Sequence, residues 1–126
     1  PVDLGEGVVA VALDAMGTPY RWGGSDANGF DCSGLIRYAY GQFGIDLPRR
    51  SRDQARSGYL VGTEVSDLRP GDVLGFSAVA GRGVSHVGLY VGDGRFIHSS
   101  STGVRVSDLV EPYWQQHFKV ARRVVR

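Results

Sequence analysis

The sequence predicts an α+β fold in which helices come first and a run of antiparallel strands follows. Helical spacing of apolar residues marks residues 6–16 and the stretch after Cys32, whereas from Asp67 onward short apolar runs are separated by glycine-rich turns. With 126 residues, the chain can bury a real core but cannot comfortably form two. We therefore expect residues 1–126 to form a single domain.

Composition excludes several classes of partner. The apolar share of 42%, the charged share of 21% and the net charge of +1 are those of an ordinary globular protein, so nothing indicates binding to nucleic acid or to a membrane surface. No apolar run is long enough to span a membrane, and no signal peptide is visible. Because the sequence begins with Pro1, we expect a mature or trimmed chain whose export or anchoring signal lies in a missing part.

Cys32 is the only cysteine, so no disulfide within the chain accounts for it. Apolar residues follow it at helical spacing: Leu35, Ile36, Ala39 and Phe43. We expect this helix to end at Gly44 and to carry Cys32 in its first turn, at the start of the buried face. Backbone N–H groups and the helix dipole favour a thiolate there. The alternative for a lone cysteine is a small buried hydrophobe.

The segments around this helix are loops and short helices. Residues 6–16 predict a first helix, ended by Gly17-Thr18-Pro19, and an aromatic, glycine-rich loop over residues 20–25 leads to the cysteine. Residues 26–31 faintly resemble a calcium loop, but its twelfth position is Arg37 instead of glutamate, which excludes calcium. A short helix is expected near Ser51.

Four arginines surround that short helix: Arg49, Arg50, Arg52 and Arg56. The simple interpretation is a solvated basic face. Beside a cleft, the same charges would favour substrates that carry carboxylates.

The second half of the chain predicts strands. A turn over residues 67–72 leads into a strand at 73–76, and residues 85–91 and 95–98 flank Gly92-Asp93-Gly94, a strong hairpin signal. Val104 and Val106 suggest another short strand. Residues 109–117 are expected to be irregular or helical and broken by Pro112, and residues 118–125 to form a closing strand.

The register of the hairpin decides which side chains share a face. If the loop has three residues, with Gly94 in the left-handed conformation, Val91 lies opposite Arg95 and Gly88 lies opposite His98. A two-residue loop would instead put His98 opposite Leu89 and on the other face.

With the three-residue loop, His86 and His98 share a face on a diagonal of about 7–8 Å between Cα atoms, and Gly88 leaves space between their rings. The other face supplies core residues, which are Val87, Leu89 and Val91. Each histidine alone could be a surface or structural residue.

Together with one cysteine, the two histidines suit nucleophilic catalysis. A cysteine nucleophile needs an imidazole as base, and that imidazole needs a third polar group to orient it, so Cys32, His86 and His98 would take these roles in order. One thiolate and two imidazoles could also bind zinc, but the close ligand spacing typical of such sites is missing, and we expect no metal.

The motifs that carry a specific resemblance occur in order along nearly the whole chain: Gly17-Thr18-Pro19-Tyr20-Arg21-Trp22-Gly23-Gly24, Phe30-Asp31-Cys32-Ser33-Gly34-Leu35, Leu47-Pro48-Arg49, Leu68-Arg69-Pro70-Gly71-Asp72, Ser85-His86-Val87-Gly88-Leu89-Tyr90-Val91-Gly92 and Phe96-Ile97-His98. In them the chain resembles the NlpC family of bacterial cell-wall cysteine peptidases, a papain-like group.

The resemblance implies a papain-like α+β fold in which the nucleophile helix packs on a central antiparallel sheet. It implies an endopeptidase that acts on peptidoglycan stem peptides, typically between γ-D-glutamate and meso-diaminopimelate, with no cofactor. It also implies Cys32 as nucleophile, His86 as base and His98 as the orienting third member.

The resemblance further implies an oxyanion site formed by Tyr20 and the backbone N–H of Cys32, and a substrate cleft lined by Tyr20, Asp31, Ser33 and Ser85. In members that cut near a free stem N-terminus, such an aspartate can hold the amine of L-alanine. On physical grounds Asp31 could equally be a helix N-cap, and Ser33 is similarly ambiguous. Arg49 is a further candidate substrate contact.

Two other classes of function remain open. The same three residues could serve an amidase or an acyltransferase, or the chain could be a non-catalytic module that binds the cell wall. We expect a monomer that acts in the periplasm or cell envelope, with peptidoglycan stem peptides as its partner and without nucleic acid or membrane contact of its own.

Overall fold

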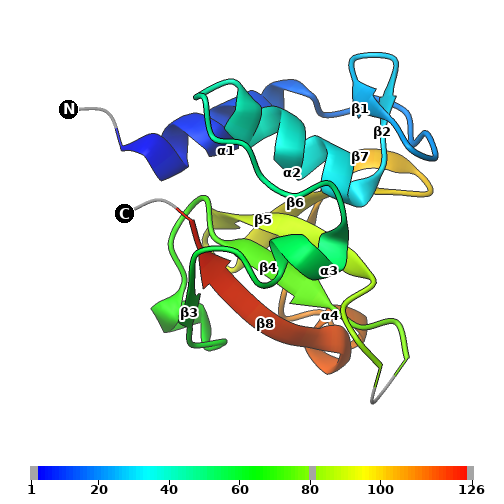
Figure 1. Ribbon diagram of the computed structural model, residues 1–126. Helices are drawn as coiled ribbons and strands as arrows, with labels where there is room; N and C mark the ends of the chain where they lie inside the picture. Colours follow the sequence, from blue (N-terminus) through cyan, green and yellow to red (C-terminus); the bar gives the residue numbers. More distant parts are fainter. Residues whose placement is uncertain (1–2, 80–81, 125–126) are drawn as a thin grey trace.

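A computed structural model describes residues 3–79 and 82–124 (Figure 1). Its elements, in chain order, are α1 (Leu4–Asp14), β1 (Ser25–Asp26), β2 (Gly29–Phe30), α2 (Cys32–Gly41), α3 (Ser51–Gln54), β3 (Tyr59–Val61), the 3-10 helix η1 (Val65–Asp67), β4 (Val73–Phe76), β5 (His86–Gly92), β6 (Arg95–Ser100), β7 (Gly103–Asp108), α4 (Pro112–His117) and β8 (Phe118–Arg123). The predicted α+β class is confirmed.

Within the described residues, the main sheet has six antiparallel strands in the order β3-β8-β4-β5-β6-β7. The last strand, β8, is therefore an interior strand between β3 and β4. Helices α1 and α2 lie together over one face of the sheet, as Figure 1 shows. Strand β3 and helix η1 were not predicted, because both are short and most of their side chains are exposed.

Helix α1 begins at Leu4, two residues earlier than predicted. The side chain of Asp3 explains this start, since its carboxylate accepts hydrogen bonds from the backbone N–H groups of Gly5 and Glu6. The helix ends at Asp14, where Ala15 is its C-cap.

Helix α2 begins at Cys32, as predicted. Its buried face differs from the prediction at one position: Tyr40 is 0% exposed and Phe43 is 38% exposed. The reason is that the helix ends at Gly41, so Phe43 lies beyond it and no longer follows the helical stripe. The Tyr40 hydroxyl donates a hydrogen bond to the backbone carbonyl of Gly71, which satisfies this polar group in the core.

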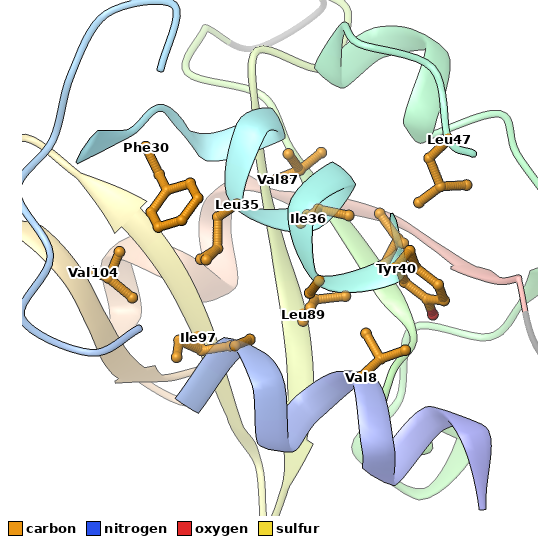
Figure 2. Close-up of a cluster of buried hydrophobic side chains, with 13 residues drawn as sticks. Val8, Phe30, Leu35, Ile36, Tyr40, Leu47, Val87, Leu89, Ile97 and Val104 are labelled. Carbon is orange, nitrogen blue, oxygen red and sulfur yellow. The ribbon is translucent and has the colours of Figure 1, made fainter. Parts of the chain in front are cut away.

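The sheet carries one apolar cluster on each face. The first lies beneath α1 and α2 and is drawn in Figure 2, where Leu35, Ile36 and Tyr40 from α2 meet Leu89 and Val87 from β5. The second comprises Leu68, Leu74, Phe76, Tyr90, Phe96, Leu109 and Ala121, with Trp114 and Phe118 packed against it. The expected core role of Val87, Leu89 and Val91 is confirmed.

The β5–β6 hairpin has the predicted register on the strands but a shorter turn than predicted. Leu89 pairs with Ile97 as predicted, but the closing pair is Gly92 with Arg95, so the turn has two residues. Asp93 and Gly94 both have positive φ, as a type I′ turn requires. A bulge between Tyr90 and Gly92 adds the residue that the shorter turn removes. The histidines therefore stay on one face.

Pro112 does not break a helix as predicted; it is the first residue of α4. Proline suits this position because its missing N–H would be unpaired there in any case. The predicted closing strand is confirmed as β8, although its last residue, Val125, lies outside the described residues. Among the described residues, no helix is long and apolar enough to cross a membrane.

Candidate active site

Cys32 lies in the first turn of α2, and most of its side chain is buried. Burial raises the pKa of its thiol above the ordinary value, and the negative charge of Asp31 adds to this. Backbone N–H groups of Val87, Ser33 and Cys32 itself act in the opposite direction without cancelling the effect of burial. The expected thiolate is therefore wrong for the resting site, because desolvation outweighs the helix terminus.

His86 and His98 contact each other as the register argument predicted. The Nε2 atom of His86 lies 2.8 Å from the Nδ1 atom of His98, and the two rings meet edge to face. The other nitrogen of His98, Nε2, lies 2.9 Å from the hydroxyl of Ser107 on β7. This chain of contacts leaves Nδ1 as the nitrogen of His86 that can serve the thiol.

These contacts restrict the tautomers of a catalytic His86. If its Nδ1 is to accept a proton, the hydrogen must sit on Nε2 and be donated to Nδ1 of His98. His98 then carries its own hydrogen on Nε2 and donates it to Ser107. Ser107 thus orients His98 in the way that His98 orients His86.

Burial keeps both histidines neutral. It lowers the pKa of His86 to about 4. It also lowers the pKa of His98 to about 3, with smaller contributions from electrostatic interaction with His86 and Arg105. At pH 7 the cavity that Cys32 and His86 both line therefore holds a neutral thiol and a neutral imidazole, and the imidazole is free to accept a proton.

Aromatic rings surround the two histidines. Trp114 of α4 stacks on His86 with ring centroids 5.7 Å apart and meets His98 edge to face at 4.9 Å. Phe76 and Phe96 contact His86 and His98 from the sheet. The face that carries the histidines is thus a second apolar core, not the less apolar face that the sequence suggested, and its rings explain the low pKa values.

Two cavities share Cys32, Tyr20 and Ser85 in their linings. The aromatic cavity has a volume of about 380 Å³, and among the residues that line it are Tyr20, Cys32, Phe76, Ser85, His86, Tyr113, Trp114 and His117. The polar cavity has a volume of about 590 Å³, and its lining includes Tyr20, Trp22, Asp31, Cys32, Ser33, Arg49, Arg50, Arg52, Val84 and Ser85. An extended peptide lying in both would pass over the thiol.

Asp31 links the start of α2 to Arg49 in the lining of the polar cavity. Its carboxylate caps α2 by accepting a hydrogen bond of 2.7 Å from the N–H of Gly34, which confirms the N-cap prediction. It also forms a two-pronged ion pair with Arg49, at 2.8 and 3.1 Å. Arg49 reaches the Ser33 hydroxyl at 2.8 Å, and its pKa is raised by the hydrogen bond to Asp31. Their roles in binding substrate stay predictions.

Tyr20 and Ser85 lie where the two cavities join. The pKa of the Tyr20 hydroxyl is raised by burial and by the neighbouring Cys32 and Asp31, so the group stays a hydrogen-bond donor at neutral pH. Ser85 is exposed, and its hydroxyl accepts a hydrogen bond of 3.1 Å from the N–H of Ala78.

Sequence reasoning missed several residues of this region. Ser107 and Trp114 contact the histidines only through tertiary packing, so no local pattern marks them. Gln54 is fully buried and donates hydrogen bonds to the carbonyls of Ser33 and Pro48, which ties α3 to the start of α2. Trp22 is 90% exposed at the edge of the polar cavity, and its place in the aromatic loop could have signalled it.

The geometry favours hydrogen bonding over metal binding. The facing nitrogens of His86 and His98 lie at hydrogen-bond distance from each other and do not converge on a common point. Among residues 3–79 and 82–124, no group of three or more histidine, cysteine or acidic side chains is arranged to hold a metal ion.

Comparison with known proteins gives consistent matches. The sequence profile of the NlpC/P60 family matches residues 17–123. Murein DD-endopeptidase MepH of Escherichia coli is 44% identical over 90% of this chain, and the bifunctional muramidase/DL-endopeptidase CwlT of Bacillus subtilis is 39% identical over 92%. The chain covers 43% and 35% of these relatives, less than half of each.

A crystal structure of an NlpC/P60 family protein from Bacillus cereus superposes with a TM-score of 0.91 at 33% identity, covering 100% of this chain and 42% of that one. The resemblance predicted from the sequence motifs and the expected papain-like α+β fold are both confirmed.

Proposed function

Because this chain belongs to the NlpC/P60 family, we propose that it is a cysteine endopeptidase that hydrolyses peptidoglycan stem peptides. The observation that carries the proposal is His86, which lines the same cavity as Cys32 and is in hydrogen-bond contact with the buried His98 behind it. A module that only binds the cell wall would have no use for such an oriented base beside a thiol.

In the first step, the Cys32 sulfur attacks the carbonyl carbon of the scissile amide while Nδ1 of His86 takes the thiol proton. Since both groups are neutral at rest, the proton moves as the bond forms and not beforehand. The backbone N–H of Cys32 and the Tyr20 hydroxyl stabilise the oxyanion. His86 then gives its proton to the departing amine as the carbon–nitrogen bond breaks, which leaves a thioester on Cys32.

In the second step, His86 removes a proton from water, and the resulting hydroxide attacks the thioester. The carbon–sulfur bond breaks, the acid product leaves, and the proton returns to the sulfur. Throughout the cycle, His98 keeps the His86 ring in one orientation, and Ser107 does the same for His98. No cofactor takes part.

We propose that the bond cleaved is the one between γ-D-glutamate and meso-diaminopimelate. The acyl side of this bond would lie in the polar cavity, where Asp31 and Arg49 offer both charges, and the amine side in the aromatic cavity. Relatives differ in this respect: MepH is named a DD-endopeptidase and CwlT a DL-endopeptidase. The DD alternative is cleavage of a cross-link between D-alanine and diaminopimelate.

The test is incubation with purified muropeptides, followed by mass spectrometry of the products. A tetrapeptide stem should yield L-Ala-D-Glu and a diaminopimelyl-D-alanine dipeptide. A cross-linked dimer cut into two intact stems would instead indicate the DD bond. Cys32→Ala should leave every substrate intact while its circular dichroism and melting temperature match those of the wild type. Cleavage that survives this substitution, or that stops with a chelator, contradicts the cysteine mechanism.

An amidase or acyltransferase would use the same residues, and the same spectra would reveal it by loss of a stem from its glycan or by transfer to an added amine. We propose that the domain acts as a monomer in the cell envelope, where its substrate is found.

A further inference from the structure

A third cavity continues from the polar cavity away from the sulfur. It has a volume of about 580 Å³ and shares Arg52, Val84 and Ser85 with the polar cavity. Its apolar lining residues, Ala55, Val84 and Val120, lie close together, since a Cβ atom built on Gly75 would be within 3.4 Å of all three side chains. We call it the arginine cavity, because its charged lining residues are Arg52, Arg56 and Arg82.

In the part of the chain that the structure describes, these three arginines lack the ion pair that four other arginines form. Arg37, Arg49, Arg95 and Arg123 each form an ion pair with an aspartate. Among the described residues, no carboxylate lies within ion-pair distance of Arg52, Arg56 or Arg82, and none of their guanidinium groups has a hydrogen-bond partner in the protein. Three like charges around one cavity repel each other, and a bound anion would relieve this repulsion.

The three side chains come from two separate segments. Arg52 and Arg56 lie in and just after α3, which Gln54 fixes to the start of α2. The backbone at Arg82 is held by a hydrogen bond from its N–H to Val79 and by one from the Ser77 hydroxyl to its carbonyl. The cationic groups are thus mounted on anchored backbone around a cavity, which a merely solvated basic face does not require.

We propose that the arginine cavity is an oxyanion-binding subsite that holds a carboxylate or phosphate group of the cell-wall polymer while the peptide lies across Cys32. This rests on the proposed function, because the polymer reaches the cavity through the groove that contains the sulfur. Guanidinium groups bind both oxyanions through paired hydrogen bonds. The apolar lining would contact the aliphatic part of the group that carries the anion.

The experiment measures equilibrium binding by calorimetry in the Cys32→Ala background, so that its outcome does not depend on catalysis. Three probes are used: the tripeptide L-Ala-γ-D-Glu-diaminopimelate, the same peptide with its carboxylates converted to amides, and a glycerol phosphate trimer. We expect the free tripeptide or the phosphate trimer to bind about tenfold more tightly than the amidated peptide, an advantage that added salt reduces.

The variant Arg52→Gln/Arg56→Gln should lose this advantage, and Arg82→Gln, on a different segment, should lose much of it. The matched controls are Arg69→Gln/Lys119→Gln and Arg69→Gln alone, which remove the same charge at exposed positions that do not line the cavity. A preference for the tripeptide identifies stem carboxylates as the source, and a preference for the trimer identifies a phosphate polymer.

The proposal is overturned if neither anionic probe binds better than the amidated peptide, or if the control pair weakens binding as much as the cavity pair. Cleavage of muropeptides by the wild-type protein is measured separately. A protein that cleaves them without an anion preference would refute the subsite alone, and one that binds anions without cleaving would refute the proposed function alone.

Discussion

The two cavities that meet at Cys32 are built in opposite ways. The aromatic cavity is formed largely by strands and by α4, and it surrounds neutral histidines with rings of Phe76 and Trp114. The polar cavity is formed by the start of α2 and its neighbouring loops, and it holds a paired aspartate and arginine. The comparison leads us to expect proton transfer on the aromatic side of Cys32 and recognition of charged groups on the polar side.

The largest effect is expected at the base on the aromatic side. His86→Gln should lower kcat by about 10³-fold, because an amide cannot accept the thiol proton, whereas KM should change little. Steady-state kinetics on a stem peptide measures both. A variant that keeps more than a tenth of wild-type kcat would show that the aromatic side does not supply the base.

The second-largest effect on kcat is expected when Gly88, which leaves space between the two histidines, is replaced. In Gly88→Ala, the new Cβ would lie 2.8 Å from a ring carbon of Phe96, 3.0 Å from the carbonyl of Ile97 and 3.3 Å from the Cβ of His98. We expect His98 to shift and kcat to fall by about 10²-fold, as misplacement of about 1 Å can cause. Gly41→Ala is the control, since a Cβ there meets nothing within 4 Å. Equal activity of the two variants would refute the packing argument.

The pH dependence follows from the lowered histidine pKa values. Activity should fall as the pH drops through about 4, where His86 becomes protonated and can no longer act as base. The free energy of unfolding should already decline as the pH falls from 6.5 toward 4, because the unfolded chain binds protons to these imidazoles before the folded one does. Kinetics and urea titrations over this range measure the two effects.

Trp114→Ala sharpens the same test. Removing the indole would expose the imidazoles of His86 and His98 to water. The pH at which activity falls on the acid side should then rise toward the ordinary histidine pKa of 6.5. If this pH is unchanged, Trp114 does not keep the histidine pair dry.

The smallest effect is expected on the polar side. Arg49→Gln breaks the ion pair with Asp31 and should raise KM several-fold with little change in kcat. The pair is partly exposed, so the free energy of unfolding should change by no more than about 1 kcal/mol. Arg37→Gln, which removes an exposed pair with Asp46 outside both cavities, is the control. A drop in kcat instead of a rise in KM would assign Arg49 to the chemistry.

Local patterns predicted much of this molecule, and tertiary contacts decided the rest. The start of α2 and the shared face of the histidines depend on helical spacing and strand alternation, which the sequence displays directly. That Tyr40 and not Phe43 lies on the buried face depends on where the helix ends. Ser107 and Trp114 reach the histidines from distant segments, and the raised pKa of Cys32 depends on how deeply the folded chain buries it.

The interior position of β8 has a consequence for how the protein folds. Cys32 is synthesised early, but the sheet that carries the histidines has a gap between β3 and β4 until β8 inserts. Pairing between segments so far apart in sequence is slow to form. A nascent chain would therefore carry the Cys32 thiol without a completed sheet beneath it, and we expect activity to appear only after β8 has inserted.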